Sequence, residues 1–298
     1  MKEFKSGFVA ILGRPNSGKS TLLNRFIGEK VSIVSPKPQT TRNKIAGILT
    51  TKDYQIVFED TPGIHKGFDD GLSKFMEKSW EAARKNTDII IYLIDGEKGV
   101  IKGDFEIIEK FSEHDTVIFA VNKTDTADKE KVFPILNELN KYKFAKDIIP
   151  ISAKTGENCD ILLQQVVSLL SNGIKYYDDD ALTDRSERFM VAEIIREKIL
   201  LFFNEEIPHG VGIEVNKFEQ VGKVYHIDCN IIVDKASHKP IIIGKNGEAL
   251  KRIAQKSRLD IEKVLSDKVY LTLWVKVREN WKENNNILND IGYNKKDI

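Results

Sequence analysis

The chain is poor in cysteine and has almost no net charge. Its 298 residues include two cysteines, Cys159 and Cys229, far apart in the sequence. This pair excludes a disulfide framework and a cysteine-based zinc site, and it suits a reducing cytosol. Lys and Arg number 46 against 45 Asp and Glu, a formal net charge of +1. Because the whole molecule has no strong field, any site that attracts nucleic acid must be a local basic patch.

Long hydrophobic runs are also missing. No apolar run approaches the roughly 20 residues with which a helix crosses a bilayer. The first residues lead directly into a predicted strand at 8–12, so we expect no signal peptide. The composition, 41% hydrophobic and 31% charged, is typical of a soluble globular protein. We expect two domains and a cytoplasmic protein, with peripheral contact to a membrane left open.

The most informative segment is the run GRPNSGKS, Gly13 to Ser20, which fits the pattern G-x-x-x-x-G-K-[ST] without departure. A strand is predicted before it and a helix after it. The N–H groups of such a loop and the helix N-terminus bind polyphosphate. We expect Lys19 to reach the outer phosphates and Ser20 to hold Mg²⁺. The nucleotide-binding candidates here are Gly13, Asn16, Ser17, Gly18, Lys19, Ser20 and Thr21.

Three further motifs select magnesium and guanine. In DTPG, Asp60 can hold the metal through water, and the Gly63 amide can meet the γ-phosphate. In NKTD, the carboxylate of Asp125 can accept two hydrogen bonds from the guanine edge, which adenine cannot supply. In SAK, a backbone amide of residues 152–154 could meet guanine O6. The candidates in these motifs are Asp60, Thr61, Pro62, Gly63, Asn122, Lys123, Asp125, Ser152, Ala153 and Lys154.

Strands and helices alternate through the first half of the chain. This rhythm predicts a doubly wound, mainly parallel α/β sheet in which the segment 45–50 is an antiparallel edge strand. The four motifs follow strands in order, and ligands bind outside the carboxyl ends of strands in such sheets. This half therefore resembles a Ras-type GTPase of the translation-factor-related class. The predicted strands are 8–12, 45–50, 55–59, 89–94, 117–121 and 148–151.

A loop is predicted between the phosphate loop and DTPG. Residues 35–45 have two prolines, a polar centre and no helical period. By likeness to the TTR element of related GTPases, we expect Thr41, with Thr40 the alternative, to close onto magnesium and the γ-phosphate. The predicted metal ligands are Ser20, Thr41 and Asp60. The predicted catalytic residues are Lys19, Thr41 and Gly63.

The glutamine with which Ras-type enzymes orient water is missing, because Ile64 follows DTPG. We expect slow intrinsic hydrolysis that a partner accelerates, with His65 as a weaker catalytic candidate. In some relatives the residue at Asn16 looks like part of a potassium site. The expected cofactors are therefore GTP or GDP and Mg²⁺, with K⁺ as a further candidate.

The second half has the order helix, strand, strand, helix, helix, strand. The turn GKNG at 244–247 joins two predicted helices, as the GxxG clamp of a KH fold does. Residues 235–258 contain seven Lys and Arg against one acid, Glu248, a local charge of +6. Such a patch attracts phosphate backbones. The division of residues 241–243 between base contact and core stays open. The RNA-binding candidates are Ile243, Gly244, Lys245, Asn246, Gly247, Lys251 and Arg252.

Three segments, DRSERFMVAEIIREK (184–198), IIIGKNG (241–247) and LWVKVRENW (273–281), closely resemble the Era family of bacterial GTPases. The likeness covers essentially the whole chain. It implies a Ras-like GTPase domain at 1–174, a linker at 175–184 and an α+β type II KH domain with a C-terminal helix at 185–298.

The resemblance also implies partners. These are the 3′ region of 16S ribosomal RNA and the 30S subunit, with GTP favouring the RNA-competent form, and no DNA. Peripheral association with anionic lipid at the inner face of the cell membrane is implied as well. We expect a monomer. Two other functions stay open, a constitutive RNA-binding scaffold in which the nucleotide is structural, and a membrane-linked signalling GTPase whose second half binds protein.

Overall fold

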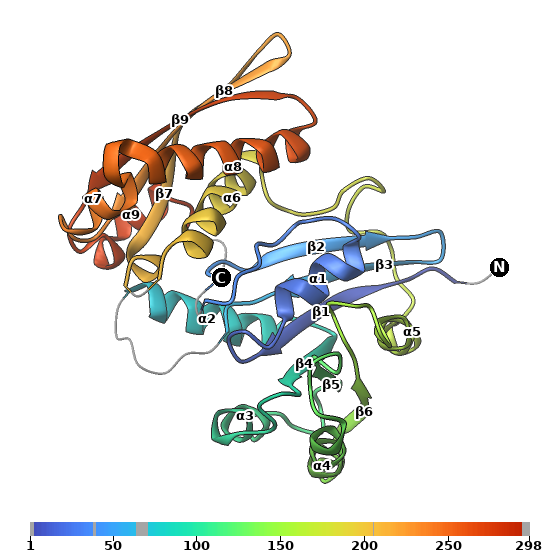
Figure 1. The fold of residues 1–298 in the computed structure, drawn as a ribbon. Coiled ribbons are helices and arrows are strands. Elements are labelled where there is room, and N and C mark those ends of the chain that lie inside the picture. The colour runs from blue at the N-terminus through green and yellow to red at the C-terminus, as the bar shows by residue number, and fades with distance from the viewer. Residues whose placement is uncertain (1–2, 38–39, 64–70, 205, 294–298) are drawn as a thin grey trace.

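The computed structural model describes residues 3–37, 40–63, 71–204 and 206–293 (Figure 1). Two units follow one another along the chain. In Figure 1 the second unit, coloured yellow to red, lies above the first, coloured blue to green. The N-terminal unit contains β1 (Lys5–Gly13), α1 (Lys19–Ile27), β2 (Ile45–Thr50), β3 (Tyr54–Asp60), α2 (Gly71–Lys85), β4 (Ile89–Asp95), α3 (Lys102–Ile108), β5 (Val117–Asn122), α4 (Lys129–Leu139), β6 (Ala145–Pro150) and α5 (Cys159–Leu169).

The N-terminal unit is built on a six-stranded sheet with the order β2-β3-β1-β4-β5-β6. The paired strands run parallel, except that β2 and β3 are antiparallel. The expected doubly wound sheet with an antiparallel edge strand is confirmed. Strand β4, IIIYLID, is buried along its whole length because helices cover both faces of the sheet. One face packs on α1 and α5, and the other on α2, α3 and α4.

The C-terminal unit is an α+β domain with a three-stranded sheet. Strand β8 pairs antiparallel with β7 and parallel with β9, and α6, α7 and α8 pack on one face. This is the predicted KH topology. Its elements are α6 (Glu187–Phe202), β7 (Val211–Val221), β8 (Val224–Val233), α7 (His238–Ile243), α8 (Glu248–Leu265), β9 (Lys268–Val277) and α9 (Asn285–Asp290). Among the described residues, no helix is long and apolar enough to cross a membrane.

The segment between α5 and α6 lies along the edge of the first sheet. The Gln55 side chain donates to the Tyr177 carbonyl at 2.8 Å and accepts from the Tyr176 amide at 2.6 Å. Farther along, the Ile48 amide donates to the Leu182 carbonyl at 2.9 Å. The Ile48 bond pairs a backbone group of the edge strand β2, and the Gln55 bonds hold the segment to β3. The change of architecture falls within this segment, which contains the predicted linker.

A shared apolar cluster joins the two units. Leu72, Phe75 and Met76 of α2 pack with residues of the C-terminal unit that include Trp281 and Tyr293. Trp281 belongs to the core, because its side chain is fully buried. Its indole N–H donates to the Gly210 carbonyl at 3.1 Å. Trp281 and Tyr293 thus pack against α2 of the first unit.

Replacing Trp281 by alanine should lower the free energy of unfolding by about 3–5 kcal/mol, because a large cavity opens where the units meet. Trp274→Ala is the matched control, since that indole is 61% exposed. We expect the control to change stability by less than about 1 kcal/mol. Denaturant unfolding of the two variants measures the difference, and equal losses would contradict this account of the interface.

Candidate nucleotide-binding and RNA-binding sites

The phosphate loop connects β1 to α1 at the carboxyl end of the sheet. Gly13 and Gly18 have φ values of +146° and +102°. A Cβ at Gly13 would lie 2.5 Å from the Leu93 carbonyl, and one at Gly18 would lie 2.1 Å from the Asn122 amide nitrogen. Both positions therefore require glycine. No side chain caps the N-terminus of α1, so its first N–H groups can bind an anion.

Lys19 is held inside this loop. Its Nζ donates to the carbonyls of Gly13 at 3.1 Å and Arg14 at 3.0 Å. Burial lowers the pKa of Lys19 to about 8, although the Asp60 carboxylate opposes this shift. The two carbonyl groups do not fully replace the water that the ammonium loses on burial. This group is therefore suited to bind a phosphate.

The three predicted metal ligands lie together. The Asp60 Oδ2 atom accepts hydrogen bonds from Ser20 Oγ at 2.6 Å and Thr41 Oγ1 at 3.2 Å, and those hydroxyls lie 2.9 Å apart. Ser32, which the sequence motifs do not indicate, donates to the same oxygen at 2.8 Å. The Thr40 hydroxyl does not contact Asp60 but donates to the Lys37 carbonyl at 2.6 Å.

The oxygen cluster fits Mg²⁺. Burial raises the pKa of the Asp60 carboxyl, although Lys19 and the three hydroxyl groups oppose the shift. Its second oxygen, Oδ1, is buried and has no hydrogen-bond partner within the described part of the chain. Carboxylate and hydroxyl oxygens are hard ligands of the kind that magnesium takes beside nucleotide phosphates.

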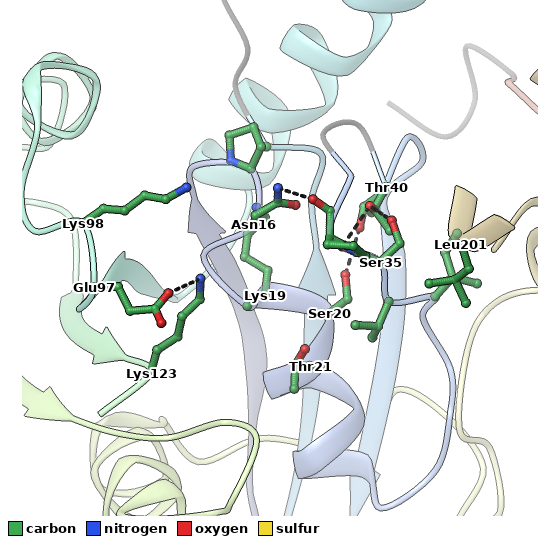
Figure 2. A pocket seen from close by; sticks show the side chains of 17 residues that line it. Asn16, Lys19, Ser20, Thr21, Ser35, Thr40, Glu97, Lys98, Lys123 and Leu201 are labelled. Carbon is green, nitrogen blue, oxygen red and sulfur yellow. Dashed lines mark hydrogen bonds and ion pairs between the residues drawn. The ribbon is translucent and has the colours of Figure 1, made fainter. Parts of the chain in front are cut away.

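A cavity of about 590 Å³ lies beside these residues (Figure 2). Figure 2 shows Lys19, Ser20 and Thr21 on one side and Thr40 on the other. Asn16 lies at its rim, where its Nδ2 donates to the Pro36 carbonyl at 2.7 Å. The other predicted residues in its lining are Gly18, Thr41, Gly63 and Lys123.

An adjoining cavity of about 380 Å³ contains the predicted guanine contacts. Asn122 joins its walls, because its Nδ2 donates to the Ser17 carbonyl at 2.7 Å and its Oδ1 accepts from the Ala153 amide at 2.9 Å. The Ser152 hydroxyl donates to Asp125 at 2.8 Å, which orients the carboxylate. The predicted residues in this lining are Gly18, Thr21, Asn122, Lys123, Asp125, Ala153 and Lys154.

Some predicted residues support the site rather than line either cavity. Thr61 is fully buried and donates to the Ile11 carbonyl at 3.2 Å, so its side chain ties β3 to β1. Pro62 is buried beside it. Ile64 and His65 lie outside the described residues. The lining residues that the motifs missed include Val34 and Leu201, of which Leu201 comes from the C-terminal unit.

The GxxG turn lies at the surface between α7 and α8. Gly244, Asn246 and Gly247 have φ values of +74°, +53° and +79°, and Lys245 is exposed beside them. A Cβ at Gly244 would lie 2.6 Å from Ala249 Cβ, so the close turn excludes a side chain there.

The neighbouring candidates differ in their surroundings. Ile242 is buried in the core, whereas Ile243 is half-buried and Ile241 is 50% exposed. Lys251 and Arg252 are both exposed, and the Arg252 guanidinium lies 4.5 Å from the centre of the Phe202 ring. Another member of the basic patch, Arg258, pairs with Glu262 at 2.9 Å. Arg258 is thus partly neutralised, whereas the other Lys and Arg side chains of the patch are exposed.

The chain is 48% identical over 294 residues to the GTPase Era of Clostridium botulinum strain Okra, covering 98% of this chain and 99% of that protein. The chain belongs to the Era family of GTPases. Similarity to the Era protein of Caldanaerobacter subterraneus subsp. tengcongensis is also 48% over 294 residues, covering 97% of this chain and 98% of that protein.

Family models and solved structures agree with the Era assignment. Residues 8–123 match the model of the 50S ribosome-binding GTPase, and residues 206–282 match that of the KH domain. A crystal structure of a substituted Aquifex aeolicus Era bound to GDP·AlF4⁻ is 37% identical, with a TM-score of 0.93 over 97% of this chain and 99% of that one. An Era structure with MgGDPNP and nucleotides 1506–1542 of 16S ribosomal RNA has the same identity, score and coverage.

The pKa of Lys19 makes nucleotide affinity depend on pH. Phosphates raise the pKa of the ammonium above its free value of about 8, so binding takes up a proton at alkaline pH. The affinity for nucleotide should be highest below the free pKa of Lys19 and should fall as the pH rises through that pKa. We expect Kd to be roughly tenfold weaker at pH 9 than at pH 7. Titration with fluorescent GDP measures this, and Lys19→Arg should flatten the profile. A flat wild-type profile would contradict the assigned pKa.

Proposed function

We propose that the chain is a GTP-hydrolysing switch that binds the 3′ region of 16S ribosomal RNA and acts in assembly of the 30S subunit. The RNA bound to the related Era protein supports this target. The observation that carries the proposal is that residues beside the metal-ligand cluster hydrogen-bond directly to the KH unit. A nucleotide can shift the equilibrium between two conformations of the chain only if it binds them with different affinities.

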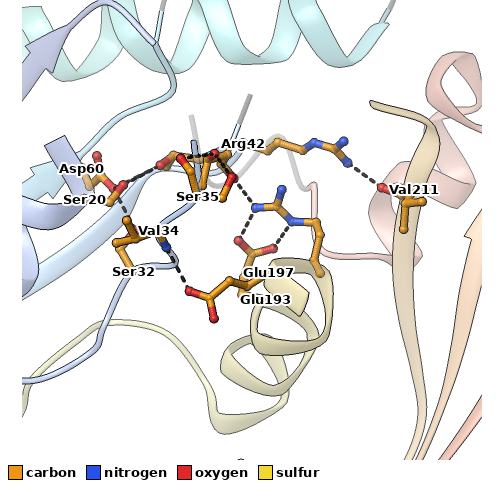
Figure 3. A network of polar contacts seen from close by, with 12 residues as sticks. Ser20, Ser32, Val34, Ser35, Arg42, Asp60, Glu193, Glu197 and Val211 are labelled. Carbon is orange, nitrogen blue, oxygen red and sulfur yellow. Dashed lines mark hydrogen bonds and ion pairs between the residues drawn. The ribbon is translucent and has the colours of Figure 1, made fainter. Parts of the chain in front are cut away.

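Two residues flanking Thr41 make the connection (Figure 3). The Arg42 side chain is 1% exposed and donates to the Val211 carbonyl at 2.7 Å. The Thr40 carbonyl accepts a hydrogen bond from Arg196 of α6. A shift of Thr41 that accompanies exchange of GTP for GDP therefore displaces two contacts with the KH unit.

The chemical step uses few protein groups. Lys19 and the phosphate-loop amides hold the phosphates, and the Gly63 amide meets the γ-phosphate. Ser20, Thr41 and Asp60 would hold Mg²⁺, which offsets negative charge on the phosphates. Ile64 cannot orient the attacking water, so we propose slow intrinsic hydrolysis accelerated by a partner.

The Lys19→Ala variant tests the coupling. Loss of a charged hydrogen-bond donor should weaken GTP binding by roughly 30- to 100-fold. RNA binding should lose its stimulation by GTP together with the nucleotide. Binding of a 3′-end 16S RNA oligonucleotide is measured with a GTP analogue and with GDP, and Lys131→Ala on α4 is the exposed control. Undiminished stimulation in Lys19→Ala would refute the coupling and favour a constitutive RNA-binding scaffold.

Potassium is a further proposed cofactor. The side-chain oxygen of Asn16 would hold K⁺ near the phosphates, where the charge offsets that of the transition state. Steady-state hydrolysis should be faster in potassium than in sodium buffer, and Asn16→Ala should remove most of the difference. Equal wild-type rates in the two buffers would exclude this role.

A membrane role is the second candidate function, because anionic lipid attracts the same Lys and Arg side chains as RNA does. We propose a cytoplasmic protein whose basic patch serves RNA first, since the GxxG turn accompanies that patch. Binding to vesicles but not to the RNA oligonucleotide would favour the lipid.

A further inference from the structure

One face of α6 lies along the loop that follows α1. Residues at spacings of three and four share a helix face, as Glu193, Arg196, Glu197 and Leu201 do. Arg196 pairs with Glu193 at 2.5 Å and donates to the Thr40 carbonyl. Figure 3 shows Glu193 and Glu197 on α6, with Glu197 reaching toward Val34. This face of the KH unit thus contacts the segment that leads to the metal ligands.

Glu197 binds this helix face to the loop after α1. It accepts from the Val34 amide at 3.1 Å and from Lys30 at 2.6 Å. Burial by itself would raise the pKa of Glu197, but hydrogen bonds from Lys198 and Lys30 hold that pKa below its usual value. Lys198 also pairs with Asp260 of α8. The charged chain joins α6, the loop after α1 and the helix that follows the GxxG turn.

Leu201 extends the same face into the nucleotide cavity. It lines the cavity with Lys19, Ser20 and Thr41, and among the described residues it is the one lining residue from the KH unit. Figure 2 shows it beside Ser35 and Thr40. Its side chain is 47% exposed, so it presents apolar surface that a bound nucleotide and its closed loop could cover.

The next residue faces the predicted RNA site. Phe202 packs partly into the KH core, and its ring lies 4.5 Å from the Arg252 guanidinium of α8. Successive residues of a helix are about 100° apart. The last turn of α6 therefore has Leu201 toward the nucleotide cavity and Phe202 toward an RNA-binding candidate.

We propose that Leu201 is part of the guanine nucleotide site and makes nucleotide release depend on the position of the KH unit. It lines the cavity at the phosphate loop and not the one that contains Asp125. Leu201 thus covers the phosphate and ribose side with Pro36, excludes water there and does not read the base. The influence of RNA on this contact, through Arg252 and Phe202, rests on the proposed function. Thermodynamic linkage requires that RNA changes the affinity for nucleotide by the same factor as nucleotide changes the affinity for RNA.

Release of fluorescent GDP and of a fluorescent GTP analogue from the full chain tests the proposal. Leu201→Ala should release both nucleotides about three- to tenfold faster, because the apolar cover is lost. Leu259→Ala is the matched control, since that leucine is 45% exposed on α8 and lines none of the described cavities near the loop. Its rates should match the wild type. Thermal unfolding checks that both variants fold.

A second arm adds the 3′-end 16S RNA oligonucleotide. RNA should change the wild-type release rate, and Leu201→Ala should reduce that change. Wild-type release rates in Leu201→Ala without RNA would overturn the proposal. Faster release in Leu201→Ala, combined with no RNA effect on the wild type, would support the Leu201 contact and refute the coupling in the proposed function.

Discussion

The Asp60 carboxylate organises the nucleotide site. It is fully buried, and one of its oxygens accepts hydrogen bonds from Ser20, Ser32 and Thr41. A buried carboxylate needs such donors, because its desolvation is costly without them. The three donors come from α1 and from both ends of the following loop. A single carboxylate therefore holds α1 and both ends of the following loop together.

The loop between α1 and β2 is consequently held from two directions. Asp60 fixes it to the first sheet, whereas α6 and the start of β7 contact it through Arg196 and Arg42. Neither unit alone provides the whole environment of this loop. The KH unit thus contacts this loop and also contributes Leu201 to the lining of the cavity beside it.

Much of the site could be predicted because its groups occur in motifs at strand ends. Ser20, Asp60 and Asp125 lie where the motifs place them, beside the two cavities. Only the structure shows that the Thr41 hydroxyl, and not that of Thr40, contacts Asp60, since the two hydroxyls have the same chemistry. Ser32 has no motif around it, and its contact with Asp60 depends on the path of the loop.

The sequence alone determined the two folds, the order of the motifs and the class of ligand, because these depend on local periodicity and on short spacings. The tertiary structure decided which residues that are distant in the sequence contribute side chains to each site. Leu201 joins the nucleotide cavity although its chain neighbours form the KH core, and Arg252 packs on Phe202 although the charge pattern indicates only a basic patch. Such contacts join residues about 50 or more positions apart, and pairing at that range leaves no periodic trace in the sequence.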